Sequence, residues 1–522
     1  MKYPIGIQDF ETLRKDGYLY IDKTAFIYRM VHTGRYYFLS RPRRFGKSLL
    51  LSTIEAYFQG KRNLFSGLAI DSLENEWTDY PVLRLDLNTG IYSSPESLIL
   101  RLERTLDQWE EKYGGDPKVK EFYLRFERIV QVASEQCGRR VVILVDEYDK
   151  PLIQNFGNEQ LQEELRGILR AFYSVLKTQD RYIKFALLTG VSKFGKLSVF
   201  SDLNNLEDIS LNNDWATLCG ITQEEIRSQL MPVVAEMAQR IGLQTEDVLG
   251  ELKSMYDGYH FGYDSEGVYN PFSLLNSLKN QRFDDYWFET GTPSFLIELL
   301  KQTNYDLNRL NHEELTSDML NLNSPVTVDP VPLLYQSGYL TIKGYDERFK
   351  MYKLGFPNKE VENGFVRYLL PYYVPGEGNR SEFFIRNFVS EIERGDVESF
   401  MERLQTMFSD ISYQVMGEME LYFQNTMYVV FKMLGFYTDV ERTTHRGRID
   451  IVIRTKDYIY VMEIKLDGSV EDALNQIEEK GYADPYRKDS RKLFKIGVNF
   501  SSSLRGIEKW RVAELNTYKL SN

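Results

Sequence analysis

Four short apolar runs divide the first 215 residues of this 522-residue chain. They occupy residues 36–39, 82–87, 141–145 and 185–188. Segments with helical periodicity, such as 93–109 and 160–177, separate them. Continuous apolar runs of this length are typical of strands buried on both faces of a parallel sheet. The pattern therefore predicts an α/β domain in which a parallel sheet has helices on both faces.

A basic loop follows the first run and precedes an apolar helical segment. Residues 41–48 read RPRRFGKS and end in the Gly-Lys-Ser of a phosphate-binding loop. Backbone N–H groups and a helix N-terminus would surround phosphates there, with Lys47 at the β- and γ-phosphates and Ser48 on Mg²⁺. Arg41 replaces the first glycine of the usual pattern, so a basic loop that merely caps a helix is the alternative. The predicted nucleotide-binding residues of this loop are Arg44, Phe45, Gly46, Lys47 and Ser48.

Two acids follow the third apolar run. Asp146 and Glu147 come directly after residues 141–145, and ligands of open α/β sheets bind beyond the carboxyl ends of strands. We expect Asp146 to hold Mg²⁺ through water and Glu147 to polarise an attacking water. Thr189 ends the fourth run and is a candidate sensor of the γ-phosphate. An ordinary surface turn and a plain strand end are the alternatives. The loop and the acids, taken as ends of consecutive strands, predict one ATP and Mg²⁺ site.

These segments together resemble the AAA-ATPase-like proteins common in anaerobic bacteria. The matching stretches are Tyr3 to Gly6, Tyr20 to Thr24, Arg41 to Ser48, Val145 to Asp149, Tyr269 to Phe272 and Leu334 to Tyr339. In that family the loop typically reads RPRRFGKS, so Arg41 fits the family pattern. The resemblance implies a P-loop ATPase of the additional-strand, catalytic-glutamate class, with a helical or winged-helix lid after the core.

Changes of pattern along the chain predict three regions. They are a P-loop ATPase core at 1–215, a mainly helical lid at 216–375 and an α/β domain at 380–522. Thr222 to Glu225 form a capping-box pattern at the start of a helix that reaches about Ile241. Residues 338–343 and 351–353 are compatible with a hairpin, and the glycine- and proline-bearing stretch 371–379 is the predicted linker.

Two apolar strands near the end of the chain carry two acids and a lysine. If the segment 448–466 turns about Lys456-Asp457, Asp450 lies across from Glu463, and Lys465 shares the face of Glu463. Carboxylates this close repel each other, and a divalent cation that prefers oxygen ligands, Mg²⁺ or Mn²⁺, removes the conflict. Lys465 would then orient or deprotonate an attacking water. A buried Asp–Lys–Glu salt-bridge cluster is the structural alternative.

This arrangement resembles the PD-(D/E)XK nuclease superfamily over about residues 410–510. Asp450 matches the strand aspartate of that superfamily, and Glu463-Ile-Lys465 matches its E-x-K. The resemblance implies an acid on the preceding helix, for which Glu420 is the candidate metal ligand; Glu418 and a solvated helix face are the alternatives. It also implies a catalytic glutamine on the following helix, and Gln476 is the candidate.

Charge and composition limit the functions that this chain can have. A net charge of −12 is not the global footprint of a nucleic-acid binder. Six basic residues within 480–495 are either a local phosphate-binding patch or an ordinary solvated face. Two cysteines and four histidines exclude a disulfide framework and a His-rich metal centre. No run approaches the ~18 apolar residues of a membrane span, and no signal peptide is evident, so we expect a cytoplasmic protein.

These features predict an ATP-binding and ATP-hydrolysing protein whose carboxy-terminal domain is a metal-dependent nuclease gated by ATP. The expected cofactors are ATP and Mg²⁺, or Mn²⁺ at the nuclease site. The expected partner is nucleic acid, with DNA favoured, and a homo-oligomer is compatible with the ATPase class. One rival is a nucleotide-dependent switch or scaffold that binds nucleic acid or protein without cutting. Another keeps the nuclease and makes the loop a nucleotide sensor with negligible turnover.

Overall fold

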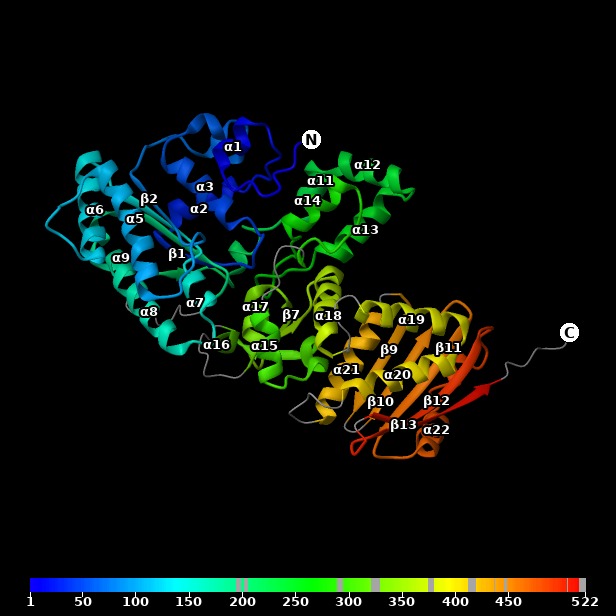
Figure 1. The fold of residues 1–522 in the computed structure, drawn as a ribbon. Coiled ribbons are helices and arrows are strands. Elements are labelled where there is room, and N and C mark those ends of the chain that lie inside the picture. Colours follow the sequence, from blue (N-terminus) through cyan, green and yellow to red (C-terminus); the bar gives the residue numbers. More distant parts are fainter. Residues whose placement is uncertain are drawn as a thin grey trace. The chain divides into compact units, whose positions relative to one another are not determined.

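The computed structural model describes most of the chain, which divides into two compact units (Figure 1). The described residues are 1–193, 199–200, 205–288, 294–320, 329–373, 380–411, 419–435, 437–445, 448–504 and 506–515. The first unit comprises Met1–Leu296 and His312–Val361, and the second comprises Ile297–Asn311 and Glu362–Asn522.

A five-stranded parallel sheet forms the centre of the first unit, in the order β2-β3-β4-β1-β5. Its strands are β1 Tyr36–Ser40, β2 Val82–Asp86, β3 Val141–Asp146, β4 Ile183–Gly190 and β5 Glu207–Asp208. Four of them coincide with the predicted apolar runs. Every residue of β1 and β3 is buried, as expected of strands that are covered on both faces. The α/β fold class is therefore confirmed.

Helices cover both faces of this sheet. They are α1 Phe10–Lys15, α2 Thr24–Thr33, α3 Lys47–Phe58, α4 Ala69–Leu73, α5 Pro95–Tyr113, α6 Phe122–Cys137, α7 Lys150–Gln154, α8 Glu159–Tyr173 and α9 Val175–Thr178. Successive strand residues point to opposite faces. Phe38 shares a core with residues of α5, α6 and α8 on one face. On the other face Tyr37 contacts Phe185, which packs against Phe58 of α3.

The strand order corrects one expectation from the sequence. The glycine loop follows β1 and the acidic pair follows β3, but these strands are not neighbours, because β4 lies between them. Leu39 of β1 pairs with Thr189, and Val145 of β3 pairs with Leu188. An inserted strand of this kind is what the additional-strand class implies. The end of β4 therefore lies between the loop and the acids.

Helices and a small antiparallel sheet complete the first unit. They are α11 Gln223–Gln229, α12 Met231–Ile241, α13 Thr245–Tyr256, α14 Pro271–Asn280, α16 Ser317–Leu320, α17 Val331–Ser337, β6 Glu313–Thr316, β7 Thr341–Asp346 and β8 Met351–Gly355. The capping box of Thr222 and Glu225 is present. The single helix predicted to reach Ile241 is wrong, because a second helix starts just before Pro232, which has no N–H to continue the first. The β7–β8 hairpin is confirmed, with β6 as a third strand in the order β6-β8-β7.

A mixed sheet forms the core of the second unit, in the order β13-β12-β11-β10-β9. Its strands are β9 Asp439–His445, β10 Arg448–Arg454, β11 Tyr458–Leu466, β12 Lys492–Ser501 and β13 Gly506–Leu515. The helices α19 Arg380–Arg394, α20 Val397–Ile411, α21 Met419–Leu434 and α22 Val470–Glu479 belong to the second unit. Two further helices, α15 Ser294–Gln302 and α18 Lys359–Tyr373, begin in the first unit and end in the second. Strands β11 and β12 are parallel and are joined through α22; the other neighbours are antiparallel. The predicted strand–turn–strand of residues 448–466 and the helix that follows it are both found.

The two faces of the second sheet are covered by different helices. Ile459 and Val461 of β11 share a core with Ile477 of α22. Tyr460, which points the other way, donates a hydrogen bond to the carbonyl of Ile392 on α19. The odd-numbered residues of β11 therefore face α22, and Glu463 and Lys465 belong to that face.

The predicted linker at 371–379 begins inside a helix. Helix α18 includes Pro371 and ends at Tyr373, whereas residues 374–379 lie outside the described part of the chain. The division between the two units falls earlier, between Val361 and Glu362, within α18.

Candidate functional sites

The loop between β1 and α3 has the backbone geometry of an anion-binding turn. Helix α3 begins at Lys47, and Gly46 before it has φ 89°. Arg44 also has a positive φ, 71°, which is uncommon for a residue with a side chain. A Cβ added to Gly46 would meet no atom within 4 Å, so the space beside the helix start is open. Backbone N–H groups at such a helix start favour anions, and the loop therefore fits a phosphate group.

Arg41 ties this loop to the rest of the first unit. Its guanidinium donates to the carbonyls of Ser40, Ser210 and Trp215 at 2.7–3.1 Å and lies 4.1 Å over the ring of Phe261. Burial lowers the pKa of Arg41, and the carbonyls and the ring compensate the buried charge. Arg41 is therefore an anchor of the loop, and its guanidinium is committed to protein groups.

Phe45 is a second anchor. Its buried ring makes edge contacts with Tyr259 and Phe261, at centroid distances of 4.8 and 5.2 Å. A contribution of Phe45 to a nucleotide site would therefore come from its backbone. The guanidinium of Arg44 lies 4.8 Å over the ring of Phe272 on α14, which connects the loop to the second half of the unit.

The ammonium group of Lys47 lies among oxygen atoms. Nζ is 2.9 Å from the carbonyl oxygen of Arg41 and 3.2 Å from that of Pro42. It is 3.5 Å from Oε1 of Glu147, and the lysine side chain is buried. The structure thus brings together the two residues that the sequence assigns to the γ-phosphate and to the attacking water.

Asp146 and Thr189 contact each other at the ends of β3 and β4. The Thr189 hydroxyl donates to Oδ1 of Asp146 at 2.8 Å, and it lies 3.3 Å from the carbonyl oxygen of Val145. Both side chains are buried. Thr189, expected to sense a γ-phosphate, is here bonded to Asp146 and fixes the orientation of that carboxylate.

Asp149 completes this cluster. It is fully buried and accepts hydrogen bonds from the backbone N–H groups of Val191 and Ser192 and from the Ser192 hydroxyl, at 2.6–3.2 Å. Burial, and secondly the charge of Glu147, raise the pKa of Asp149. A Cβ on Gly190 would lie 2.7 Å from Oδ1 of Asp149, so glycine permits this approach. Asp149 thereby ties the turn that carries Glu147 to the end of β4.

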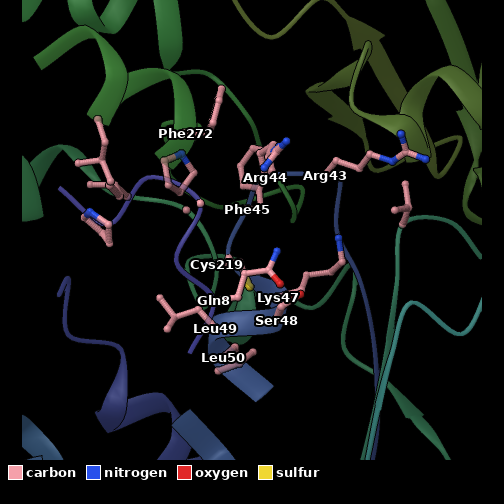
Figure 2. Close-up of a pocket in the computed structure, with 18 of the residues that line it drawn as sticks. Gln8, Arg43, Arg44, Phe45, Lys47, Ser48, Leu49, Leu50, Cys219 and Phe272 are labelled. Carbon is pink, nitrogen blue, oxygen red and sulfur yellow. The ribbon is translucent and has the colours of Figure 1, made fainter. Parts of the chain in front are cut away.

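A cavity of about 400 Å³ runs along the loop (Figure 2). Its lining includes the loop and its neighbours Arg43–Leu50 with Glu147, the N-terminal segment Pro4–Gln8, Leu218–Ile221 with Phe272, and further residues of the first unit such as Trp287. Ligand cavities usually have volumes of 300–1,000 Å³. This cavity is therefore large enough for a small-molecule ligand whose phosphates lie on the loop.

In the second unit β10 and β11 pair in the predicted register, with Asp450 directly opposite Glu463. The side chains of Asp450 and Glu420 lie outside what the structure describes. The Nζ atom of Lys465 is 3.2 Å from Oε1 of Glu463 and contacts Oε1 of Gln476 on α22. Glu463, Lys465 and Gln476, three of the predicted nuclease residues, therefore lie together on one face of the sheet.

Helix α22 packs closely over this group. Gly497 of β12 pairs with Glu463, and a Cβ there would lie 2.7 Å from the carbonyl oxygen of Val470. The Glu463 side chain is 0% exposed and that of Lys465 is 21% exposed, so Lys465 connects the group to solvent. Among the described side chains, no three His, Cys, Asp or Glu are grouped to hold a metal ion. A metal site here would therefore need Asp450 beside Glu463.

The predicted basic patch is largely neutralised by acids. Lys495 is buried and pairs with Glu478. The other ion pairs of this stretch are Arg487 with Asp484 and Glu478, Arg491 with Asp489, and Lys492 with Glu514. These contacts favour the interpretation of residues 480–495 as an ordinary solvated face over a phosphate-binding patch.

Comparison with known proteins agrees with the two domains expected from the sequence. A family model described as "Predicted AAA-ATPase" matches residues 4–200, and a PD-(D/E)XK nuclease superfamily model matches residues 418–510. An "Uncharacterized protein in vnfD 5'region" of Azotobacter chroococcum mcd 1 is 34% identical over 529 residues, which cover 98% of this chain and 99% of that protein. The chain belongs to the AAA-ATPase-like family. Its carboxy-terminal part carries a PD-(D/E)XK nuclease superfamily domain, so both resemblances seen in the sequence are confirmed.

Several residues of this AAA-ATPase-like protein have site contacts that the sequence did not reveal. Asp149 follows Glu147 closely, but its bonds to Ser192 join the ends of the neighbouring strands β3 and β4. Gln8 lines the cavity, and no spacing rule connects it to the loop. Gly497 was visible as a glycine in an apolar strand, which is a signal for close backbone approach.

No described helix has the length and apolar character that crossing a membrane requires.

Proposed function

We propose that this AAA-ATPase-like protein binds and hydrolyses ATP and that its PD-(D/E)XK domain cleaves nucleic-acid phosphodiesters with a divalent ion, under the control of ATP. The observation that carries the proposal is that one chain holds two groups of side chains whose chemistry suits phosphates. The first is the glycine loop with Lys47 and Glu147 within 3.5 Å of each other. The second is the pair of Glu463 and Lys465, with Asp450 in register.

The residues of the first unit fit a magnesium nucleotide. The open space at Gly46 and the N-terminus of α3 suit phosphates. Ser48 and Asp146 would hold Mg²⁺, and the hydrogen bond from Thr189 keeps the Asp146 carboxylate in place. Lys47 would neutralise phosphate charge, and Glu147 would orient the attacking water and accept its proton. Arg44 and Phe45 would contribute backbone N–H groups of the loop.

The donor set of the second unit suits a hard cation. Glu463 and Asp450, with Glu420 from α21, would supply carboxylate oxygens, which Mg²⁺ and Mn²⁺ prefer. The ion supplies Lewis acidity at the scissile phosphate. Lys465 would orient the attacking water and stabilise charge that develops on phosphate oxygens. Gln476 contacts Nζ of Lys465 and would hold that ammonium in place.

Cleavage by the full chain tests the nuclease. Single- and double-stranded DNA and RNA are incubated with the wild type, with and without Mg²⁺, Mn²⁺ and ATP, and products are resolved on gels. We expect metal-dependent cleavage that Asp450→Ala reduces at least a hundredfold. Asp457→Ala, in the exposed turn between the same two strands, is the matched control and should cleave like the wild type. Equal cleavage by Asp450→Ala and the wild type would refute the assignment.

One observation favours a second candidate function, a nucleotide-dependent switch or scaffold that does not cut. Glu463 is fully buried beside Lys465, as a purely structural ion pair would be. Breaking a buried pair by removing one partner costs about 3–5 kcal/mol. This candidate therefore predicts that Glu463→Gln lowers the free energy of unfolding by that amount and that no metal or nucleic acid supports cleavage by the wild type. The nuclease predicts lost cleavage with most of the stability retained.

A further inference from the structure

The small antiparallel sheet of the first unit carries aromatic side chains that neither candidate site uses. Tyr345 of β7, labelled in Figure 1, is paired across the hairpin with Tyr352 of β8. Tyr263, from the segment before α14, contacts Tyr345, and Phe349 lies in the turn of the hairpin. We call these four residues the hairpin platform. We propose that it binds unpaired bases of a single-stranded nucleic acid, as a contact additional to the proposed nuclease site of the second unit.

The three tyrosines form a ladder from the core to the surface. The ring centroids of Tyr352 and Tyr345 are 4.8 Å apart, and those of Tyr345 and Tyr263 are 4.9 Å apart. Both distances are typical of favourable aromatic pairs. Tyr352 is buried and pairs in the sheet with Leu315 of β6, whereas Tyr263 is 49% exposed. The outermost ring is therefore supported by two others and is accessible to a flat ligand.

The turn of the hairpin adds a second exposed ring and positive charge. Phe349 is 62% exposed, and the guanidinium of Arg348 lies 5.1 Å from its ring centroid. Arg348 and Lys350 are both exposed. Residues 343–353 hold four basic side chains against two acidic ones, in a chain whose net charge is −12. Aromatic rings beside cations fit a polymer that has flat bases and a phosphate backbone.

Hydrogen bonds hold the backbone beneath both exposed rings. The carboxylate of Asp346 accepts bonds from two backbone N–H groups of the turn at 2.9 and 3.0 Å, the second of them from Phe349. The Ser265 hydroxyl donates to the carbonyl of Gly262 at 3.0 Å and so closes the turn that carries Tyr263. Because these turns are already ordered, less conformational entropy is lost when a ligand binds.

The exposed rings favour unpaired bases over a duplex. Bases in a duplex are stacked on one another, whereas the faces of unpaired bases can stack on aromatic side chains. Such stacking tolerates any sequence, because every base has a π-face. The residue after Tyr263 is the exposed acid Asp264. We therefore expect the phosphate contacts at Arg348 and Lys350.

Binding in the absence of metal tests the platform. A fluorescein-labelled DNA strand of mixed sequence, about 20 nucleotides long, is titrated with the full chain in EDTA, alone or annealed to its complement. Fluorescence anisotropy gives the dissociation constants. The variants are Tyr263→Ala, Phe349→Ala and Phe349→Trp, which keeps an aromatic ring. Phe383→Ala, which removes an exposed phenylalanine on α19, is the matched control. EDTA prevents metal-dependent cleavage, so the measurement reports binding alone.

We expect the wild type, Phe349→Trp and Phe383→Ala to bind the single strand at least about tenfold more tightly than the duplex. Tyr263→Ala and Phe349→Ala should each weaken single-strand binding about five- to hundredfold, which corresponds to the loss of one stacked base. Single-strand affinity that neither alanine variant changes would refute the platform and leave the proposed nuclease site unaffected. Absence of binding to either form of DNA would also refute it, and the rings would then suit a protein partner.

Salt dependence tests the cations separately. Combining Arg348→Gln with Lys350→Gln should reduce the slope of log affinity against log salt concentration by about 1.4, because each lost phosphate contact accounts for about 0.7 on a single strand. Lys118→Gln with Lys120→Gln, which removes two exposed lysines before α6, should leave the slope unchanged. A slope that is the same in the wild type and in the hairpin double variant would refute contact between the hairpin and the nucleic-acid backbone.

Discussion

The ammonium group of Lys47 has contacts that a phosphate can replace. Two of its neighbours are neutral carbonyl oxygens, of Arg41 and Pro42, at 2.9 and 3.2 Å. A negatively charged phosphate attracts the ammonium more strongly than a neutral carbonyl oxygen does. A phosphate on the loop would therefore compete well with these carbonyls. The carboxylate of Glu147, 3.5 Å away, would remain close to the same phosphate.

Replacing Lys47 tests this exchange. We expect Lys47→Ala to weaken ATP binding at least a hundredfold, because a buried cation next to the phosphates is lost. Lys15→Ala, which removes an exposed lysine on α1, should bind ATP like the wild type. Calorimetric titration of each full-length variant gives the comparison. ATP affinity that is equal in Lys47→Ala and the wild type would show that the loop does not hold the triphosphate.

Glu360 predicts a pH dependence of stability. It is buried, accepts a 2.8 Å hydrogen bond from the backbone N–H of Trp287, and burial raises its pKa to about 8. Because the folded state keeps the proton that the unfolded chain releases near pH 4.5, this contribution to stability is full below that pH. It is lost as the pH rises through about 8 and amounts to at most about 4–5 kcal/mol.

The measurement is thermal unfolding at pH 5, 6.5 and 8. The melting temperature of the wild type relative to that of Glu360→Gln should fall steadily from pH 5 to pH 8, since the glutamine does not titrate. Glu266→Gln, which alters an exposed acid, should follow the wild type at each pH. Parallel curves for the wild type and Glu360→Gln would contradict a titration of Glu360 in this range.

At the residue scale the sequence predicted the candidate site residues better than it predicted the contacts that hold them in place. Residue type and local spacing were sufficient to nominate Lys47, Asp146 and Glu463. They did not predict that Arg41 bonds to Ser210 and Trp215, because those partners are far away along the chain and are brought near only by folding. Thr189 was nominated as a sensor because it ends a strand, and its bond to Asp146 depends on where β4 enters the sheet.

At the scale of the elements, helix α22 forms much of the environment of the candidate nuclease residues. It carries Gln476, and it covers Glu463 because Gly497 leaves room for its first turn. A Cβ on Gly497 would lie 2.7 Å from the carbonyl oxygen of Val470 and 2.8 Å from the Leu474 side chain. A side chain at this position would therefore push the helix away from the sheet.

Gly497→Ala should consequently destabilise the second unit by about 1–3 kcal/mol, the usual cost of overpacking. It should also lower cleavage, because Gln476 would move relative to Lys465. Gly250→Ala is the matched control: it lies inside α13, and a Cβ there meets nothing within 4 Å, so stability should rise by about 0.4–1 kcal/mol. Denaturant unfolding of the wild type and the two variants measures these differences in the free energy of unfolding. Unchanged stability of Gly497→Ala would mean that α22 shifts without cost.

The sequence was sufficient to predict which strands form, but not which strands are neighbours in the sheet. Apolar periodicity was sufficient for β1 to β4 and for the β10–β11 hairpin, whose register places Asp450 opposite Glu463. Periodicity carries no information about which strand lies beside which, so the insertion of β4 between β1 and β3 was implied only by the resemblance to the additional-strand class. Pro232 gave a signal for the break between α11 and α12, but the apolar pattern on either side concealed it.

At the scale of the whole molecule, α18 is the element through which the proposed ATP control would act. It begins at Lys359 in the first unit and continues to Tyr373 in the second. Trp287 lines the cavity and donates its backbone N–H to Glu360 in the first turn of this helix. A ligand can shift such an arrangement only as far as it binds one state better than the other. Nucleotide in the cavity would act on α18 through Trp287 and Glu360.

ATP control predicts three different responses of cleavage by the full chain. The cleavage rate of the wild type should change at least several-fold when ATP is added. It should return to the basal rate as ATP is consumed. Lys47→Ala should cleave at the basal rate at ATP concentrations that saturate the wild type, because its ATP affinity is strongly weakened. Glu147→Gln should bind ATP without hydrolysing it and keep the changed rate, which separates binding from turnover. If all three proteins cleave equally with and without ATP, the two units act independently, and the nucleotide serves a function other than control of the nuclease.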